Sequence, residues 1–473
     1  MTTPALWTPE ALARAMTARA AGPAPRAATG VSIDTRTLEP GDLFFAIRGD
    51  NRDGHDFVAA ALERGAAAAV VAPDRADEFA RIGRVWVVED VLAAMVALGQ
   101  AARERTAARI AAITGSVGKT GSKEALRTIL DRQGATHASV ASYNNHWGVP
   151  LSLARMPGES AYGIFEIGMN NAGEIAPLVA MVRPHAALVT TVEPVHLENL
   201  GSIEAIADEK ASIYGGLVAG GAAIVNRDNP QFERMLATAK ASPAGRIVTF
   251  GEHEAADVRL VRLIPMADMS VVEARVHGEH VTYRLGSPGR HVALNSLGVL
   301  ATALELGADL ALCAIAFADV TPPSGRGAQI RLVAPGGEIT LLDESYNANP
   351  ASMRAAFDVL AQTPVGLRGR RVVVLGDMLE LGPDGPAMHA GLARSIIDNG
   401  IDVVYAAGPL MKSLWQALPL EKRGAWAPSA ADLEPMVLAG LRAGDAVTVK
   451  GSNGSRTGRI VAAMRSHFAP QPA

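Results

Sequence analysis

The sequence has one cysteine, no long apolar run and no excess of basic residues, and each shortage excludes a class of protein. Cys313 alone cannot form an internal disulfide, which suits a reducing compartment. It lies in an apolar, helical-looking run, so we expect a small buried side chain rather than a nucleophile. Apolar runs such as Ala66–Ala72 are far shorter than the roughly 20 residues that cross a bilayer. The net charge of −4 provides no basic face for nucleic acid.

The start of the chain gives no sign of export. The first turns carry Glu10 and Arg14 and lack a continuous apolar stretch, so we expect no secretory signal and a cytoplasmic protein. The chain has 473 residues, of which 49% are hydrophobic. At roughly 150 residues per domain, this length predicts about three domains with sizeable cores.

Residues 1–105 have the pattern of a small α/β unit. A helix is expected over Pro9–Ala20, followed by a Pro/Gly/Ala linker near Ala21–Gly30. The other expected elements are strands at Val31–Ile33, Asp42–Ile47 and Ala67–Val71 and a helix at Phe57–Arg64.

Residues 106–323 alternate strands and helices, which predicts a parallel sheet covered by helices on both faces. The expected strands are Ile110–Ile113, Gly163–Ile167, Ala187–Thr191 and Ala222–Val225, an antiparallel ribbon spans about Asp257–Leu285, and a helix follows at Leu294–Leu306.

Residues 324–473 restart the alternation after the linker-like Thr321-Pro-Pro-Ser-Gly-Arg-Gly. Strands are expected at Ile339–Leu342, Arg371–Leu375, Val403–Ala406 and Ala446–Val449. A second doubly wound, Rossmann-like domain is the economical interpretation, so the fold class is α/β with three units in a row.

The strongest local motif is Thr114-Gly-Ser-Val-Gly-Lys-Thr120, which follows an apolar strand and opens a helix. Gly115 and Gly118 let backbone amides turn toward phosphate oxygens, and the helix start adds free N–H groups. Lys119 would neutralise phosphates and the Thr120 hydroxyl would ligate Mg²⁺. Ile113 stands where a full phosphate-binding motif has its first glycine. The alternative is an ordinary strand-to-helix turn with a surface lysine.

This shortened loop resembles that of the Mur ligase family, and further blocks follow in the family's order. They are Asp34-Thr-Arg, Pro40–Ile47, Gly49–Phe57, Tyr143–Pro150, Phe165–Asn170, Arg183-Pro184, His196–Ser202, Lys210–Tyr214, Leu342–Pro350, Val374–Gly382 and Val449–Ser452. The resemblance covers essentially the whole chain. It implies a UDP-precursor-binding unit over 1–105, a central ATP-binding unit over 106–323, and a unit over 324–473 that binds the incoming dipeptide and closes on ATP.

The resemblance also implies a metal and nucleotide site. Glu166 and His196 match magnesium ligands beside Thr120, and Lys210 matches a lysine that the family carbamylates, so that two Mg²⁺ ions are expected. Alone, these residues would be a solvated strand end, a structural histidine and a surface helix lysine. The implied catalytic set is Lys119, Lys210, His196 and Glu166.

The remaining implied roles concern ATP and the substrates. The nucleotide-binding set comprises Thr114, Gly115, Ser116, Val117, Gly118, Lys119, Thr120, Asn295, Arg326, Asp343 and Glu344. The substrate-binding set comprises Thr35, Arg36, Asn144, Asn145, Tyr346, Asn347 and Asn349. Val292 stands where some relatives have Asn, and the surroundings of Arg326 differ from the usual Pro-Gly-Arg. For Asp343 and Glu344, a chance acidic strand end is the alternative.

The activity that the resemblance implies is ATP-dependent attachment of D-alanyl-D-alanine to UDP-N-acetylmuramoyl-tripeptide through an acyl phosphate, by a monomer. Two alternatives remain open: a sister ligase that adds the third residue, and a nucleotide switch without ligase chemistry. Ser116-Val117 in the loop and Lys123-Glu124 after it favour the dipeptide-adding branch. A switch would not need the set Glu166, His196 and Lys210.

Overall fold

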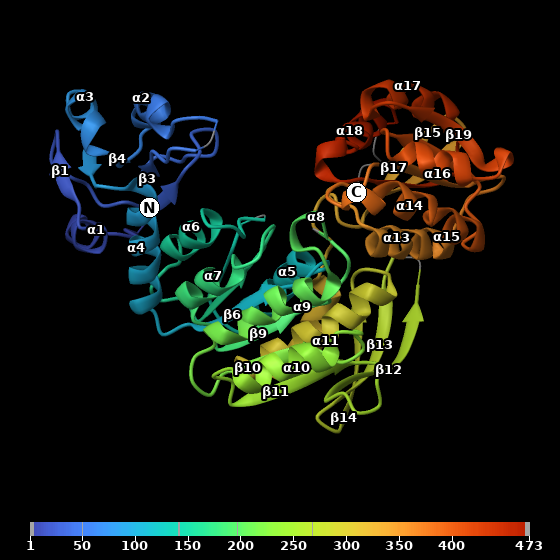
Figure 1. Cartoon of the computed structure of the whole chain (residues 1–473), viewed down its shortest axis with the longest axis horizontal. Coiled ribbons are helices and arrows are strands. Elements are labelled where there is room, and N and C mark those ends of the chain that lie inside the picture. Colours follow the sequence, from blue (N-terminus) through green and yellow to red (C-terminus); the bar gives the residue numbers. More distant parts are fainter. Residues whose placement is uncertain (1–3, 50, 141, 196, 267, 469–473) are drawn as a thin grey trace.

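The computed structural model describes residues 4–49, 51–140, 142–195, 197–266 and 268–468. Three sheets follow one another along the chain, and Figure 1 shows the parts built on them as a curved row of three bodies. We call these parts the N-terminal, central and C-terminal units. The predicted α/β class with three successive units is confirmed.

The N-terminal unit carries a small sheet of order β1-β5-β4-β3-β2. Its elements are α1 (Pro9–Met16), β1 (Arg19–Ala21), β2 (Gly30–Ser32), β3 (Asp42–Phe45), α2 (Val58–Glu63), β4 (Ala68–Val71), α3 (Ala76–Ala80), β5 (Val85–Val87) and α4 (Val91–Glu104). The expected helix Pro9–Ala20 is wrong at its end, because Thr17 takes a left-handed conformation (φ 50°) and residues 19–21 pair with β5.

The central unit has the sheet order β14-β13-β12-β11-β10-β9-β6-β8-β7. Its elements are β6 (Arg109–Thr114), α5 (Lys119–Asp131), β7 (Thr136–Ala138), α6 (Gly148–Ala154), β8 (Tyr162–Glu166), α7 (Ile175–Val182), β9 (Ala186–Val189), α8 (Leu197–Leu200), α9 (Ile203–Ala211), β10 (Ala222–Asn226), α10 (Phe232–Ala241), β11 (Arg246–Gly251), β12 (Val258–Pro265), β13 (Ser270–Val276), β14 (Glu279–Leu285), α11 (Arg290–Glu305) and α12 (Leu310–Ala316). The expected antiparallel ribbon is confirmed as β12–β14, and β12 joins it to the parallel strands through β11.

Both faces of the parallel strands are buried, because successive side chains of a strand point to opposite faces. In β6, Ala111 and Ile113 belong to the core under α5, α11 and α12, whereas Ile110 and Ala112 belong to the core under α7, α9 and α10. Cys313 lies buried in the first of these cores, as expected.

The C-terminal unit has the order β15-β16-β20-β17-β18-β19, parallel except for the edge strand β15. Its elements are β15 (Ala328–Ala334), β16 (Gly337–Glu344), α13 (Pro350–Gln362), β17 (Arg371–Gly376), α14 (Gly385–Ala390), α15 (Leu392–Asp398), β18 (Val403–Ala407), α16 (Met411–Ala417), β19 (Arg423–Ala427), α17 (Ala430–Gly440), β20 (Ala446–Lys450) and α18 (Gly458–His467). Across the described ranges, every helix is too short or too polar to span a bilayer.

The N-terminal and central units share a core. Leu151 and Ala154 of α6 pack among the apolar side chains of the first unit, and the indole N–H of Trp7 donates to the Ala154 carbonyl at 2.9 Å. The N-terminal unit is therefore fixed to the central unit at α6, directly after the loop Ser142–Trp147.

Candidate active site

The predicted phosphate loop has the expected strand–turn–helix geometry between β6 and α5. Gly115 and Gly118 take φ values of 148° and 87°, and a side chain at either position would collide with Thr190 or Asn295. The loop is tied to the neighbouring strand end, because the Ser116 amide donates to the Thr191 carbonyl at 2.8 Å and the Thr190 hydroxyl donates to the Val117 carbonyl at 2.6 Å. Thr114 ends β6 below the turn. The start of α5 thus opens toward a cavity.

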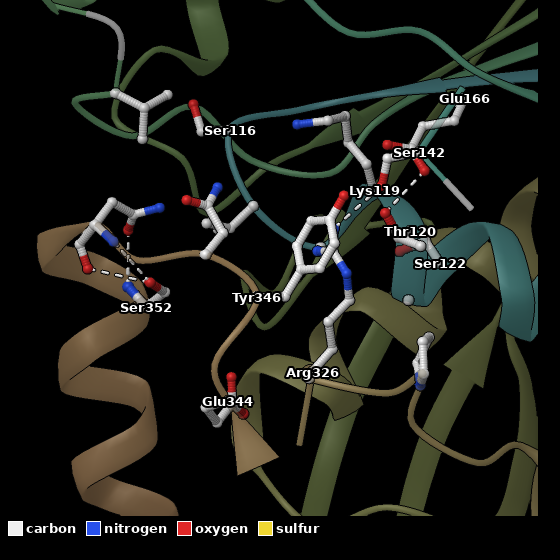
Figure 2. A pocket seen from close by; sticks show the side chains of 18 of the residues that line it. Ser116, Lys119, Thr120, Ser122, Ser142, Glu166, Arg326, Glu344, Tyr346 and Ser352 are labelled. Carbon is white, nitrogen blue, oxygen red and sulfur yellow. Dashed lines mark hydrogen bonds between the residues drawn. The ribbon is translucent and has the colours of Figure 1, made fainter. Parts of the chain in front are cut away.

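This cavity, of about 770 Å³, lies where the central and C-terminal units meet. The residues of both units that line it include predicted site residues, namely Ser116, Val117, Gly118, Lys119, Thr120, Asn144, Asn145, Glu166, Asn295, Arg326, Glu344, Tyr346, Asn347 and Asn349. Figure 2 shows side chains from both units pointing toward one another across it. Residues that are far apart in the sequence therefore form one site.

Lys119 begins α5, and its ammonium donates to the Gly115 carbonyl at 2.5 Å, across the turn. Burial lowers the pKa of Lys119, and the nearby charge of Arg326 lowers it further, whereas Glu166 acts in the opposite direction. Two cations of different units thus face the same space beside free helix N–H groups. That combination is suited to a polyphosphate.

Glu166 ends β8 and is only 1% exposed. Its carboxylate accepts a hydrogen bond from the Thr120 hydroxyl at 2.9 Å (Figure 2). It also accepts one from the Asn144 amide at 2.7 Å. A buried carboxylate beside a hydroxyl supplies the hard oxygen donors that Mg²⁺ prefers, and Mg²⁺ takes its other ligands from water and phosphates. The residues present therefore fit a magnesium site, although no group of three or more His, Cys, Asp or Glu gathers within the described ranges.

Two further metal residues were predicted from the sequence. His196 lies outside the described residues. Lys210, near the end of α9, is 2% exposed and does not line the cavity. Burial lowers its pKa well below the ordinary lysine value, and the charge of Lys119 adds to this, against a smaller opposing effect of Glu209. No described residue forms a hydrogen bond or a salt bridge with the Lys210 amine.

Asn295, from α11, borders the loop closely. A Cβ atom added at Gly118 would lie 2.5 Å from the side-chain amide nitrogen of Asn295. The helix α11, which carries Asn295, therefore packs directly against the phosphate loop. Val292, one turn earlier, also lines the cavity.

The acidic pair Asp343 and Glu344, at the end of β16, already has partners within the C-terminal unit. Asp343 accepts hydrogen bonds from the Ser345 amide and hydroxyl at 3.2 and 2.6 Å and does not line the cavity. Glu344 does line it, and pairs with Lys450 at 3.1 Å. The buried Lys450, at the end of β20, was not singled out from the sequence, although it lies in one of the blocks that carry the resemblance.

The predicted substrate residues fall into two groups. Asn347 and Asn349 line the cavity, but the Asn349 side chain caps α13, accepting from the Ser352 amide at 2.9 Å. Thr35 and Arg36 lie in the N-terminal unit, outside this cavity. The Arg36 guanidinium is 85% exposed and pairs with Asp34 at 2.6 Å.

Ser142 is a cavity residue that sequence reasoning missed. Its hydroxyl accepts hydrogen bonds from Tyr346 at 3.1 Å and Arg326 at 3.4 Å, both from the far side of the cavity. A lone serine before Tyr143 carries no local signal that could have revealed these contacts.

Known proteins match most of the chain. Residues 27–109 match the model of the Mur ligase family catalytic domain, residues 113–303 the Mur ligase middle domain, and residues 328–453 the Mur ligase glutamate ligase domain. The chain is 31% identical to a UDP-N-acetylmuramoyl-tripeptide–D-alanyl-D-alanine ligase of Rickettsia prowazekii, covering 91% of this chain and 94% of that protein. It is 35% identical to the Escherichia coli protein of the same name, over 80% and 81% of the two chains. The crystal structure of MurF from Acinetobacter baumannii superposes with a TM-score of 0.84 at 28% identity, over 97% of this chain and 99% of that one.

Proposed function

The chain belongs to the Mur ligase family, and from that premise we propose that it attaches D-alanyl-D-alanine to UDP-N-acetylmuramoyl-tripeptide at the expense of ATP. Relatives that bear this activity as their name align with most of the chain. The observation that carries the proposal is the cavity in which a phosphate loop, two cations and a buried carboxylate from two units converge.

The first step transfers the γ-phosphoryl group of ATP to the terminal carboxylate of the tripeptide. One carboxylate oxygen bonds to phosphorus as the bond to the ADP oxygen breaks, which leaves an acyl phosphate and ADP. Positioning and charge neutralisation account for most of such a transfer. The loop amides and Lys119 hold the phosphates from one side, and Arg326 holds them from the other.

Magnesium would be held at the start of α5. Thr120 and Glu166 are its protein ligands in this proposal, with His196 and a carbamylated Lys210 assigned by the resemblance alone. Bound Mg²⁺ supplies charge neutralisation for the phosphate oxygens. Asn144 orients the Glu166 carboxylate through the 2.7 Å hydrogen bond.

Carbamylation of Lys210 has physical support in its surroundings. Only a neutral amine adds to CO₂, and the lowered pKa of Lys210 raises the neutral fraction near pH 7. Addition of the neutral amine to CO₂ forms an N–C bond, releases one proton, and turns the uncharged side chain into an anion. That anion suits a site beside Lys119 and magnesium.

In the second step the amine of D-alanyl-D-alanine attacks the acyl phosphate carbon, loses a proton, and expels phosphate. The acyl phosphate must be shielded from water until then, and a site walled by two units provides that shield. The segment Tyr346–Asn349 supplies the dipeptide side of the wall. Its Asn349 acts by fixing the start of α13.

The remaining assignments follow from position in the chain. Residues 1–105, with Thr35 and Arg36, would hold the UDP end of the acceptor, residues 106–323 bind ATP, and residues 324–473 bind the dipeptide. A monomeric state is part of this proposal. The proposed use of ATP and a UDP-linked acceptor favours the cytoplasm as the site of the reaction.

The test is a phosphate-release assay across a matrix of UDP-muramoyl peptides and incoming amino acids or dipeptides. Release that requires both the tripeptide acceptor and D-alanyl-D-alanine supports the proposal. Release with the dipeptide acceptor and a single amino acid would assign the chain to the ligases that add the third residue. Release from ATP alone would indicate a nucleotide switch.

A further inference from the structure

Three side chains from two units meet beside the phosphate loop (Figure 2). Ser142 belongs to the central unit, whereas Tyr346 and Arg326 are held to the C-terminal unit. The Arg326 guanidinium lies over the Tyr346 ring, 4.1 Å from its centroid. The Ser142 hydroxyl accepts from the Tyr346 hydroxyl at 3.1 Å and from the Arg326 guanidinium at 3.4 Å. One hydroxyl oxygen has two lone pairs, so it can accept both bonds at once.

Ser142 has a fixed position because the loop Ser142–Trp147 is held by contacts on several sides. Asn144 bonds to Glu166 through its side chain, and its carbonyl accepts from the Gly168 amide at 2.8 Å. Asn145 accepts from the Gly148 amide at 2.9 Å at the start of α6. Trp147 packs against the core of the N-terminal unit. Any group bonded to Ser142 is thereby fixed relative to the phosphate loop.

Arg326 is held to the C-terminal unit by its backbone neighbours. The Gly327 amide donates to the Asp343 carbonyl at 2.8 Å, and the Tyr346 amide donates to the Gly325 carbonyl at 3.1 Å. The long side chain of Arg326, however, has many rotamers and faces the like charge of Lys119. Both effects favour rotamers that point into solvent. Something must hold the guanidinium in the cavity.

We propose that Ser142 is a positioning residue that, together with Tyr346, holds the Arg326 guanidinium over the phosphate loop before nucleotide binds. This inference deepens the proposed function and rests on it for the nature of the ligand, a nucleotide polyphosphate. The aromatic ring fixes the plane of the guanidinium, and the serine hydroxyl fixes its end. The arginine then needs less ordering when the phosphates arrive, and preorganisation of this kind raises affinity.

The test measures binding of a non-hydrolysable ATP analogue with Mg²⁺ to the full chain by calorimetry. We expect Ser142→Ala to raise the Kd about fivefold, which corresponds to the net value of about one hydrogen bond. Ser142→Thr keeps the hydroxyl and should bind nearly as wild type. Tyr346→Phe keeps the ring under the guanidinium and should raise the Kd about twofold. Ser413→Ala, in α16, is the matched control and should leave the Kd unchanged.

The decisive comparison is a double-mutant cycle. If Ser142 acts through Arg326, Ser142→Ala adds no further loss in an Arg326→Ala background. A wild-type Kd for Ser142→Ala, or the same loss in both backgrounds, overturns the proposal. No acceptor or dipeptide is present, so the two proposals fail separately. If the wild-type protein binds the analogue but forms no peptide bond, only the proposed ligase activity is contradicted. If the wild-type protein binds and ligates but Ser142→Ala has an unchanged Kd, only the positioning role of Ser142 is contradicted.

Discussion

The fold changes the acid–base chemistry of Lys210. A fully solvated lysine is charged at neutral pH, but burial, aided by the charge of Lys119, lowers the pKa of Lys210 well below its ordinary value. Burial of an amine at this position therefore lowers the free energy of unfolding at neutral pH. A carbamate that carries negative charge beside magnesium would explain why the position is a lysine.

Lys210→Ala should lose nearly all ligation, because the proposed carbamate oxygens disappear. Added short-chain carboxylic acids should restore part of the activity by placing a carboxylate in the space left by the side chain. Lys119→Ala should also lose ligation, about 100-fold or more, since it removes a phosphate-binding charge. The same acids should not rescue it, so this variant is the control. Full activity of Lys210→Ala without any acid would refute the carbamate.

The lowered pKa of Lys210 also predicts how stability depends on pH. Between the lowered folded-state pKa and the unfolded value near 10.5, the unfolded chain binds the extra proton, so this lysine makes stability rise with pH. Lys210→Met should therefore be more stable than wild type at pH 7 in CO₂-depleted buffer, and its advantage should shrink toward pH 10. Thermal unfolding at several pH values measures this. A constant difference across the range would contradict the assigned burial effect.

At the scale of elements, the turn between β6 and α5 depends on glycines at two positions. Gly115→Ala and Gly118→Ala should each destabilise the central unit by about 1–3 kcal/mol and weaken nucleotide binding, because φ is positive and the new methyl group would meet Thr190 or Asn295. Gly121→Ala is the matched control. Within the described ranges, a Cβ atom added there would meet no atom of another element within 4 Å, and the site is helical, so thermal stability should hold or increase. An unaffected Gly115→Ala protein would contradict the loop geometry.

The start of α13 depends on Asn349, whose side chain and that of Ser352 form a reciprocal cap. Asn349→Ala should lower the stability of the C-terminal unit by about 1 kcal/mol, whereas Asn349→Ser should keep most of it, because serine also caps helices well. Urea unfolding followed by a probe in the C-terminal unit distinguishes them. Equal losses in the two variants would show that capping is not what this side chain contributes.

The elements also show which parts of the structure the sequence could predict. The phosphate loop was predictable because its glycines, lysine and threonine act locally, within one strand–turn–helix unit. The edge strands β15 and β19 were missed, although β15 forms a hairpin with the neighbouring β16. The strands β1 and β5 were missed because strands of three residues depend on partners distant in sequence. Ser142 was missed for the same reason, since its partners are about 200 positions away.

At the scale of the whole molecule, the two walls of the active cavity belong to different units. The phosphate loop and Glu166 come from the central unit, and Arg326 and Tyr346 come from the C-terminal unit. The loop Ser142–Trp147 contacts both of these units and packs its tryptophan against the N-terminal unit. The resemblance could suggest which residues act, but only the tertiary structure shows that one loop touches all three units.

In the proposed reaction, cleavage of ATP at the start of α5 drives formation of a peptide bond. The most direct measurement follows ADP, phosphate and the UDP-linked pentapeptide together, in one reaction with Mg²⁺, ATP, UDP-N-acetylmuramoyl-tripeptide and D-alanyl-D-alanine. We expect the three products in equal amounts, and none when either the acceptor or the dipeptide is omitted. ADP and phosphate formed without the pentapeptide, or no reaction with all components present, would contradict the account.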